Sequence, residues 1–386
     1  MIIKVNPLDT VLFRTPAPFN AGEDYIANSI FPPYPHTYAG MIEKNGSVVN
    51  DEKTQKIRYK IGISGVMLDD VLLFKQPLDL ARCDLTGKRK GQVYYKQIEK
   101  APVSNYPLEY ITKEAQEWEE ISRYKDYYMP IQEIENYING RAISNKCYPL
   151  SNLYNKEIHT GIEISKESKS IVSTKMYKKN MIRLYHKGDH PLENKVALFF
   201  EISGADLKDN GIVKLGGRNK TATLKKVDMD INIPFNPNSS QYFKLYFATP
   251  AIFKNGWIPK WVSLNSQGFY DGVFTKKGRR VKVKLLCACV GNYLPVGGFS
   301  AENKQRPREM NYAIPSGSVY YFQLLEGKME DVIKLFHQKC ISDYRTGLGF
   351  DYEIRDRYRY CDRGYGYALV GNLTDEQISY LKGRNQ

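Results

Sequence analysis

Long apolar runs are missing from this sequence, and none approaches the ~20 residues that a membrane-spanning helix requires. The opening segment places Asp9 where a secretory signal would need its apolar core, so the sequence does not predict export. The six cysteines contain no C-x-x-C pair, and none of the five histidines stands at ligand spacing to a cysteine, which argues against a zinc module. We therefore expect a reduced, cytoplasmic protein with no metal, no cofactor and no membrane partner.

Signatures of catalysis are scarce as well. The sequence has no G-x-S-x-G, no H-E-x-x-H, no P-loop and no Cys/His pair. His36 and His159 could in principle act as general bases for metal-independent cleavage of RNA, but a lone histidine is more often structural. The sequence therefore favours a protein that is not an enzyme and leaves a metal-independent endoribonuclease as the alternative.

Positive charge and length are what the sequence does have. Lys and Arg number 56 and Asp and Glu 42, which gives a net charge of +14. Such an excess favours a polyanionic partner, with nucleic acid ahead of a membrane surface because no amphipathic anchor is evident. The alternative is a bias toward AT-rich codons, since Lys, Tyr, Asn and Ile are all abundant. The length of 386 residues exceeds one ordinary globular core and indicates two domains.

A Pro/Asn/Ser-rich segment at residues 233–240 is a plausible linker and divides the chain into domains 1–235 and 236–386. The second domain combines strand patterns with an amphipathic helix over 329–344, in the order β–(α)–β–β–α–β. That order is the ferredoxin-like (RRM-like, βαββαβ) arrangement. Its expected strands are 242–248, 281–286, 317–324 and 365–370.

The first domain is interpreted as a second ferredoxin-like unit, more irregular and carrying insertions. A helix is expected from Thr37, and the acidic stretch at about 107–138 is interpreted as a helical insertion. Because acidic side chains are repelled by RNA, this insertion is a candidate docking face for a protein partner. The expected strands are 2–13, 196–202, 212–215 and 221–227. The fold class predicted for the whole chain is therefore α+β.

Residues 276–284 include six basic residues and no acidic residue. On a strand, Arg280, Lys282 and Lys284 would share one face, opposite Val281 and Val283. Such a basic face could follow an RNA backbone, and a solvated outer face is the alternative.

A second nucleic-acid signal lies at residues 355–360, where arginine alternates with aromatic residues. Arg357 and Tyr358 in this segment suit phosphate contact and base stacking on single-stranded RNA. The alternative is a solvated run of charge balanced by neighbouring aspartates.

The glycine-rich string at 363–370 is similar to the RNP1 signature of RNA-recognition motifs. Its place after the last helix argues against that motif, because RNP1 lies on the third strand, with a helix and a fourth strand still to follow. Gly364 and Gly366 instead predict a loop whose backbone approaches a phosphate or a neighbouring chain, and purely structural turn glycines are equally consistent.

Several short strings follow one another along the chain. The strings are NPLDTVLFR (6–14), PFNAGE (18–23), SIFPPYPHTYAG (29–40), HTGIEI (159–164), MY (176–177), IRL (182–184), LGGR (215–218), GGF (297–299), AIPSGSVYYF (313–322) and the glycines at 364 and 366. Taken together and in this order, they resemble the family of the third subunit of the Cmr complex, the type III-B CRISPR RNA-guided effector, within the RAMP superfamily. Tyr34 and His36 depart from the family pattern, because small residues are common at these positions.

This resemblance implies two ferredoxin-like domains and a non-catalytic role in antiviral defence. It implies that the protein holds the 5′ tag of the guide RNA and contacts the large polymerase-like subunit and the repeated backbone subunit. The candidate RNA-binding residues drawn from the motifs and from this resemblance are Arg14, Asn20, His36, Arg141, His159, Arg183, Gly216, Gly217, Arg218, Arg280, Lys282, Lys284, Gly297, Gly298, Arg357, Tyr358, Gly364 and Gly366.

Overall fold

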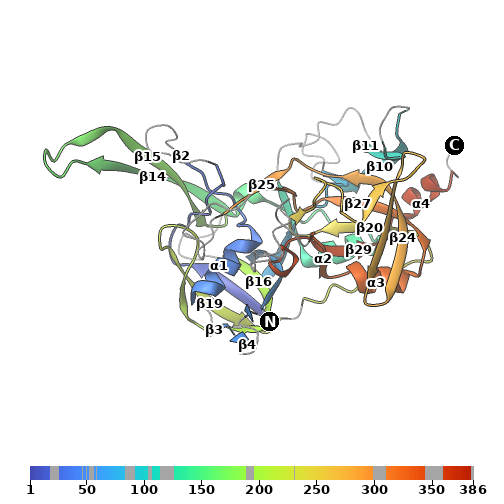
Figure 1. Ribbon diagram of the computed structural model, residues 1–386, viewed down its shortest axis with the longest axis horizontal. Helices are drawn as coiled ribbons and strands as arrows, with labels where there is room; N and C mark the ends of the chain where they lie inside the picture. The colour runs from blue at the N-terminus through green and yellow to red at the C-terminus, as the bar shows by residue number, and fades with distance from the viewer. Residues whose placement is uncertain are drawn as a thin grey trace. The chain divides into compact units, whose positions relative to one another are not determined.

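The protein has an α+β fold in which strands predominate, as expected from its sequence (Figure 1). In the described part of the chain, the four α-helices are all short, and none is long and apolar enough to cross a membrane. The computed structural model describes residues 1–17, 26–45, 47–48, 50–51, 56–57, 59–82, 92–102, 107–113, 126–187, 195–229, 231–298, 310–343 and 360–383.

The chain divides into two compact units, and neither is a continuous stretch of sequence. The passage at residues 230/231 lies close to the expected boundary at 235. However, residues 73–149 belong to the second unit, so the division differs from the expected 1–235 and 236–386. Unit 1 comprises Met1–Leu72, Leu150–Asp230 and Pro295–Asn311, and unit 2 comprises Leu73–Pro149, Ile231–Leu294 and Tyr312–Gln386.

The core of unit 1 is an antiparallel sheet in the order β6-β16-β1-β19-β18. Ile3 and Val5 of the central strand β1 are fully buried, as expected for alternating apolar positions. Helix α1 (Pro35–Asn45) confirms the helix expected from Thr37 and packs Tyr38 on Phe200 of β16, with ring centroids 4.9 Å apart. The strands are β1 (Ile2–Pro7), β6 (Lys60–Leu68), β16 (Val196–Ser203), β18 (Ile212–Lys214) and β19 (Thr221–Val227).

A long antiparallel hairpin of β14 (Tyr154–Ile164) and β15 (Ile171–Leu184) also belongs to unit 1. Strand β2 (Ile26–Ala27) pairs with β15 in parallel, and both green strands extend well beyond β2 in Figure 1. Most side chains of β14 are exposed, whereas Met181 and Ile182 near the end of β15 are buried. The hairpin therefore has an anchored base and an exposed outer part.

The core of unit 2 is a second antiparallel sheet in the order β22-β23-β24-β27-β20-β29-β28. Its hydrophobic cluster joins alternate residues of the central strands to one face of helix α3 (Met329–Phe336). The strands are β20 (Tyr242–Phe247), β22 (Val262–Leu264), β23 (Tyr270–Lys276), β24 (Arg279–Cys289), β27 (Val319–Glu326), β28 (Lys339–Cys340) and β29 (Tyr367–Gly371).

The structure corrects the helix expected over 329–344 and decides the stretch before residue 281, which was expected to be either helical or irregular. The helix expected over 329–344 ends at Phe336, because His337 is extended and β28 follows. Residues 249–280 form short strands and loops with no helix. Trp261 of this segment packs 5.4 Å from Phe336 and 5.8 Å from Phe322, so aromatic rings cover the sheet where a helix was a candidate.

The opposite face of the unit 2 sheet is covered by residues from the segment 73–149. Helix α2 (Ile131–Ile138) lies against β29, where a Cβ added to Gly371 would be 3.1 Å from the Ile138 Cα. The Tyr246 hydroxyl of β20 donates to the Lys75 carbonyl at 2.7 Å. This sheet is therefore covered on both faces.

The acidic segment expected to be helical over 107–138 is only partly so. Residues 110–113 form strand β11 (Tyr110–Lys113), residues 127–130 form β12 (Tyr127–Pro130), and only α2 is helical among the described residues of this segment. Residues 114–125 lie outside the described part, so the docking role of their acidic side chains stays a prediction.

The remaining elements are short. They are β3 (Ser47–Val48), β4 (Asn50–Asp51), β5 (Lys56–Ile57), β7 (Val71–Lys75), β8 (Leu80–Arg82), β9 (Val93–Tyr95), β10 (Gln97–Lys100), β13 (Tyr148–Pro149), β17 (Ala205–Asp206), β21 (Ala251–Ile252), β25 (Leu294–Val296), β26 (Asn311–Ile314) and α4 (Asp375–Leu381).

Candidate nucleic-acid interface

One face of the β14–β15 hairpin gathers aromatic and basic side chains. Residues paired directly across an antiparallel ladder project to the same side, and every second pair shares a face. The register pairs His159 with Lys179 and Gly161 with Tyr177, two steps apart along the ladder. These four residues therefore lie on one face, together with Arg183.

Tyr177 lies across Gly161. A Cβ added to Gly161 would overlap the Tyr177 ring, so only glycine permits this close approach. The Lys179 Nζ lies 4.2 Å from the centroid of the ring, and the guanidinium carbon of Arg218 lies 5.7 Å from it. Hydrogen bonding and charge from Lys179, with a smaller contribution from Arg218, lower the pKa of the Tyr177 hydroxyl.

Arg218 reaches this face from the turn between β18 and β19. The turn is closed by the Leu215 amide, which donates to the Lys220 carbonyl at 2.8 Å. A Cβ on Gly216, whose φ is +69°, would lie 2.6 Å from the Leu12 carbonyl oxygen, and the Gly217 amide donates to that oxygen at 2.9 Å. The two glycines hold the turn against the Leu12 backbone and so position Arg218.

An ion-pair network anchors the base of the hairpin. The Asp9 carboxylate accepts from Arg183 at 3.0 Å and from the Lys220 Nζ at 2.7 Å. Arg183 also donates to both oxygens of Glu157, and the His159 Nε2 lies 3.7 Å from Glu157. The Lys220 hydrogen bond, assisted by the Thr10 amide, lowers the pKa of Asp9 to about 2. Arg183 and His159 therefore already have carboxylate partners.

Lys179 and Arg218 differ from these paired cations. Within the described ranges, neither makes an ion pair with a carboxylate. Both contact the Tyr177 ring, and Tyr177 is half-buried on the hairpin. A partly exposed aromatic ring can stack on a base, and two such cations beside it can bind the adjoining phosphates.

The basic strand expected in the second domain is present but is largely paired. Arg280, Lys282 and Lys284 do share a face of β24, opposite the buried Val281 and Val283. The carboxylate of Glu326 accepts from Arg280 at 2.9 Å and lies 3.3 Å from Lys282. Glu109 accepts from the Lys284 Nζ at 2.7 Å. Intramolecular carboxylates therefore neutralise much of this face.

Gly364 and Gly366 are buried rather than exposed. The Gly364 carbonyl accepts from the Thr249 hydroxyl at 2.7 Å, and the Gly366 amide donates to the Pro250 carbonyl at 2.7 Å. Both glycines have positive φ, and a Cβ on Gly366 would lie 2.7 Å from the Ser342 Oγ. This geometry favours the structural alternative over contact with a phosphate.

The remaining candidates are scattered. Arg14 is exposed and donates to the Ala17 carbonyl, and His36 lies near the start of α1 with its ring 5.8 Å from Tyr34. Arg141 lies in unit 2, 3.8 Å from Glu135. A Cβ on Gly297 would lie 3.2 Å from Pro16, whereas none of the described atoms lies within 4 Å of one on Gly298. Asn20, Arg357 and Tyr358 lie outside the described residues.

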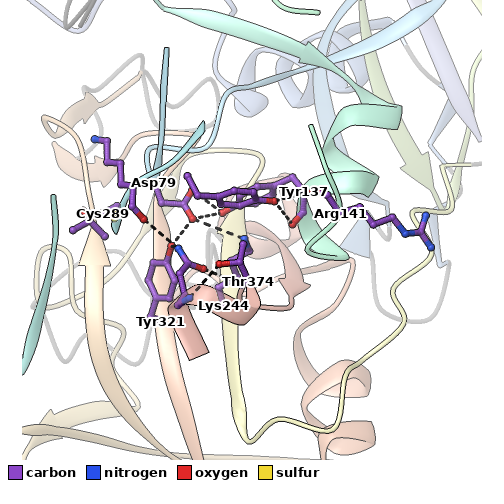
Figure 2. A network of polar contacts seen from close by, with 11 residues as sticks. Asp79, Tyr137, Arg141, Lys244, Cys289, Tyr321 and Thr374 are labelled. Carbon is purple, nitrogen blue, oxygen red and sulfur yellow. Dashed lines mark hydrogen bonds and ion pairs between the residues drawn. The ribbon is translucent and has the colours of Figure 1, made fainter. Parts of the chain in front are cut away.

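A buried polar network in unit 2 was not expected from the sequence (Figure 2). The Asp79 carboxylate accepts from the Tyr137 hydroxyl at 2.7 and 2.8 Å and from the Tyr321 hydroxyl at 2.5 Å. The Lys244 Nζ lies 3.9 Å from Asp79 and 3.5 Å from the centroid of the Tyr137 ring. Burial lowers the pKa of Lys244 to about 8. Asp79 and Lys244 are both fully buried, so this network is structural.

Sequence reasoning placed His159, Arg183, Gly216, Gly217 and Arg218 among the site residues, and the structure brings all five to one side of unit 1. It missed Tyr177 and Lys179, although Tyr177 lies in one of the resembling strings. The available signal was an aromatic and a basic residue two positions apart, which share a face when the segment is a strand. Among the described residues, no three His, Cys, Asp or Glu side chains form a cluster that could hold a metal ion.

Comparison with known proteins gives a family model and similar solved structures. The family model described as CRISPR-associated protein (Cas_Cmr3) matches residues 3–373. A chain in "Cryo-EM structure of the Type III-B Cmr-beta bound to cognate target RNA" has a TM-score of 0.51 at 14% identity, covering 95% of this chain and 96% of that chain. A chain in "Cryo-EM structure of the Type III-B Cmr-beta bound to cognate target RNA and AMPPnP, state 1" has a TM-score of 0.46 at 15% identity, covering 83% and 86%. No curated protein matches the chain.

Proposed function

The chain belongs to the CRISPR-associated Cas_Cmr3 family, and on this basis we propose that it is a non-catalytic, RNA-binding subunit of a type III-B CRISPR (Cmr) effector complex. The resemblance to this family that the sequence strings indicated is thereby confirmed. The proposed RNA is the guide RNA, held at its 5′ tag, and the proposed protein partners are the large polymerase-like subunit and the backbone subunit.

The observation that carries RNA binding is the partly exposed face formed by Tyr177, Lys179 and Arg218. Stacking on an aromatic ring needs an unpaired base, so this face suits single-stranded RNA better than a duplex. Lys179 and Arg218, which have no carboxylate partner among the described residues, supply the electrostatic part of the affinity. The neighbouring Asp9–Arg183–Glu157 network keeps the hairpin base rigid, which reduces the entropy lost on binding.

A salt titration of a fluorescent RNA that carries the repeat-derived tag tests this proposal. Replacing Lys179 and Arg218 with glutamine should flatten the slope of log K against log salt by about 1.4, which is twice the ~0.7 per phosphate contact on a single strand. Tyr177→Ala should weaken binding without a comparable change of slope, and Tyr177→Phe should restore the affinity because the ring is kept. Wild-type slope and affinity in all three variants would remove this face from the RNA site.

The alternative function is a metal-independent endoribonuclease, with His36 or His159 as general base. The contact of His159 with Glu157, which Arg183 also binds, is the observation that keeps this alternative open. We expect purified protein to leave repeat-containing RNA intact in the presence of a chelator. Cleavage that disappears in His36→Ala or His159→Ala would establish the enzyme instead.

We also infer that each sheet derives from a ferredoxin-like unit. The four principal strands of unit 1 lie in the order β6-β16-β1-β19, and those of unit 2 lie in the order β24-β27-β20-β29. Numbered along the chain, both orders are 2-3-1-4, that of a ferredoxin-like sheet. Among the described residues, each unit keeps one of the two crossover helices, α1 in unit 1 and α3 in unit 2.

A further inference from the structure

Unit 2 contains a cavity of about 740 Å³ beside the loop between β21 and β22. This volume falls within the ~300–1,000 Å³ typical of pockets for small ligands. Ala288, Val290 and Ile314 contribute an aliphatic lining, and none of the lining residues carries a charged side chain. The cavity belongs neither to the buried Asp79 network nor to the hairpin face of unit 1.

Three aromatic side chains line this cavity. Tyr293 and Tyr312 pack edge to face, with centroids 4.9 Å apart, and remain 68% and 55% exposed. Trp257 is fixed from behind, because its ring packs on Tyr270 at 5.8 Å and its carbonyl accepts from the Tyr320 hydroxyl at 2.6 Å. A rigid indole and two exposed phenol rings form a preorganised surface for a flat ligand.

The chemistry of the lining favours an uncharged, planar ligand with hydrogen-bonding edges. The exposed Asn292 carries an amide that can both donate and accept, as the edge of a nucleobase does. The cations lie outside the cavity, where Lys254 and Lys260 are exposed on the loop that carries Trp257. The Asp343 carboxylate holds this loop by accepting from the amides of Lys254 at 2.7 Å and Lys260 at 3.3 Å.

We propose that this cavity binds one unpaired nucleobase of an RNA strand, with the adjoining phosphates next to Lys254 and Lys260. The choice of RNA rests on the proposed function. An apolar side chain of a partner protein would fill the aromatic walls but would leave both the Asn292 amide and the two exposed lysines of the Trp257 loop without a role. The cavity thus adds a second site for one base to the one proposed at the Tyr177 face.

The experiment uses the full-length protein and single-stranded RNAs in which 2-aminopurine replaces one base at successive positions. Stacking quenches 2-aminopurine fluorescence, so binding should quench one position strongly. The pair Tyr293→Ala and Tyr312→Ala should abolish that quenching and raise Kd about 5- to 150-fold, as expected when base–aromatic stacking is lost. Tyr293→Phe with Tyr312→Phe should retain both signals. Leu325→Ala, at a 43% exposed residue outside the cavity lining, is the matched surface control.

The outcomes separate this site from the function on which it rests. Unchanged quenching and affinity in the alanine pair, with RNA still bound, would overturn the base site and leave RNA binding at the Tyr177 face intact. If the wild-type protein binds none of the RNAs, the proposed function fails and the base site fails with it. If the alanine pair binds RNA normally but no longer assembles with its protein partners, the cavity is a protein-docking site and our inference is wrong.

Discussion

At the residue scale, Lys244 is the least expected feature of this protein. A lysine with no exposed surface is rare, and here its Nζ lacks a hydrogen-bond partner among the described residues. Its charge is stabilised by the Tyr137 ring at 3.5 Å and by Asp79 at 3.9 Å. Because desolvation outweighs this stabilisation, the folded protein holds the lysine proton less tightly than the unfolded chain does.

Lys244 should make stability rise with pH in a window set by its two pKa values. The pKa is about 8 in the folded protein and 10.5 ordinarily, so between these values the unfolded chain binds the extra proton and the free energy of unfolding increases with pH. Buried tyrosines such as Tyr246 have raised pKa values and act in the opposite sense near pH 10 and above. From about pH 7.5 to 9.5, the free energy of unfolding of the wild type should rise by on the order of 1–3 kcal/mol. Urea unfolding of Lys244→Met should show a flatter rise over the same pH range. Identical pH profiles for the variant and the wild type would contradict this.

Gly161 offers a second test at a single residue. Gly161→Ala should displace the Tyr177 ring, because the added Cβ would occupy its place. The partly exposed ring can move aside with little loss of stability. RNA affinity should fall by at most the ~1–3 kcal/mol of one stacked base. Gly40→Ala in α1 is the matched control, since nothing lies within 4 Å of its Cβ. Equal RNA affinity for the two variants in a fluorescence titration would show that the ring position is unimportant.

At the element scale, the two basic strand surfaces should contribute unequally to RNA binding. Lys179 and Arg218 have no carboxylate partner in the described structure, whereas Glu326 and Glu109 neutralise the basic face of β24. A cation that must first leave an intramolecular carboxylate gains less from a phosphate.

Replacing Arg280, Lys282 and Lys284 with glutamine should therefore change the salt slope by less than about 2, the value for three unpaired phosphate contacts at ~0.7 each. Replacing only Lys179 and Arg218 should change it by about 1.4. Both variants are titrated with the same fluorescent RNA over the same salt range. A larger slope change in the β24 variant than in the hairpin variant would reverse the assignment and make β24 the main phosphate-binding surface.

At the scale of the whole molecule, the assignment of residues 73–149 to unit 2 decides which parts of the chain can fold together. Asp79 and Tyr137 come from this segment, while Lys244 and Tyr321 come from the sheet. Without the segment, one sheet face would expose Tyr246 and Tyr321 and leave Lys244 without its aromatic neighbour.

A fragment of residues 236–386 should therefore fail to fold by itself, although the sequence suggested it as a domain. We expect it to bind a hydrophobic dye and to lack sharp thermal unfolding, as a loosely packed state does. A fragment in which residues 73–149 are joined ahead of 231–386 by a flexible linker should unfold cooperatively. Cooperative unfolding of the shorter fragment in calorimetry would show that the segment is dispensable.

The local sequence pattern determined the positions of several strands and of helix α1, and it also indicated the family. The strand at 221–227 is observed as expected, and those at 196–202 and 242–248 agree within one residue at an end. Helix α1 begins two residues before Thr37. These elements could be predicted because hydrophobic periodicity is a property of neighbouring residues. The strings that resemble the Cmr family likewise depend only on local sequence, and the family is confirmed.

Pairing between segments distant in sequence decided the structure of residues 107–138 and the surroundings of the candidate site residues. The helix expected over 107–138 became β11, β12 and α2 within the described residues, because strand partners and packing override local propensity. Arg218 lies beside the Tyr177 ring only because the turn after β18 brings it to the hairpin. Gly364 and Gly366, by contrast, are buried and make hydrogen bonds with Thr249 and Pro250. Sequence alone could name the residue types suited to RNA, but only the tertiary structure decided which of them are exposed together and which are already paired.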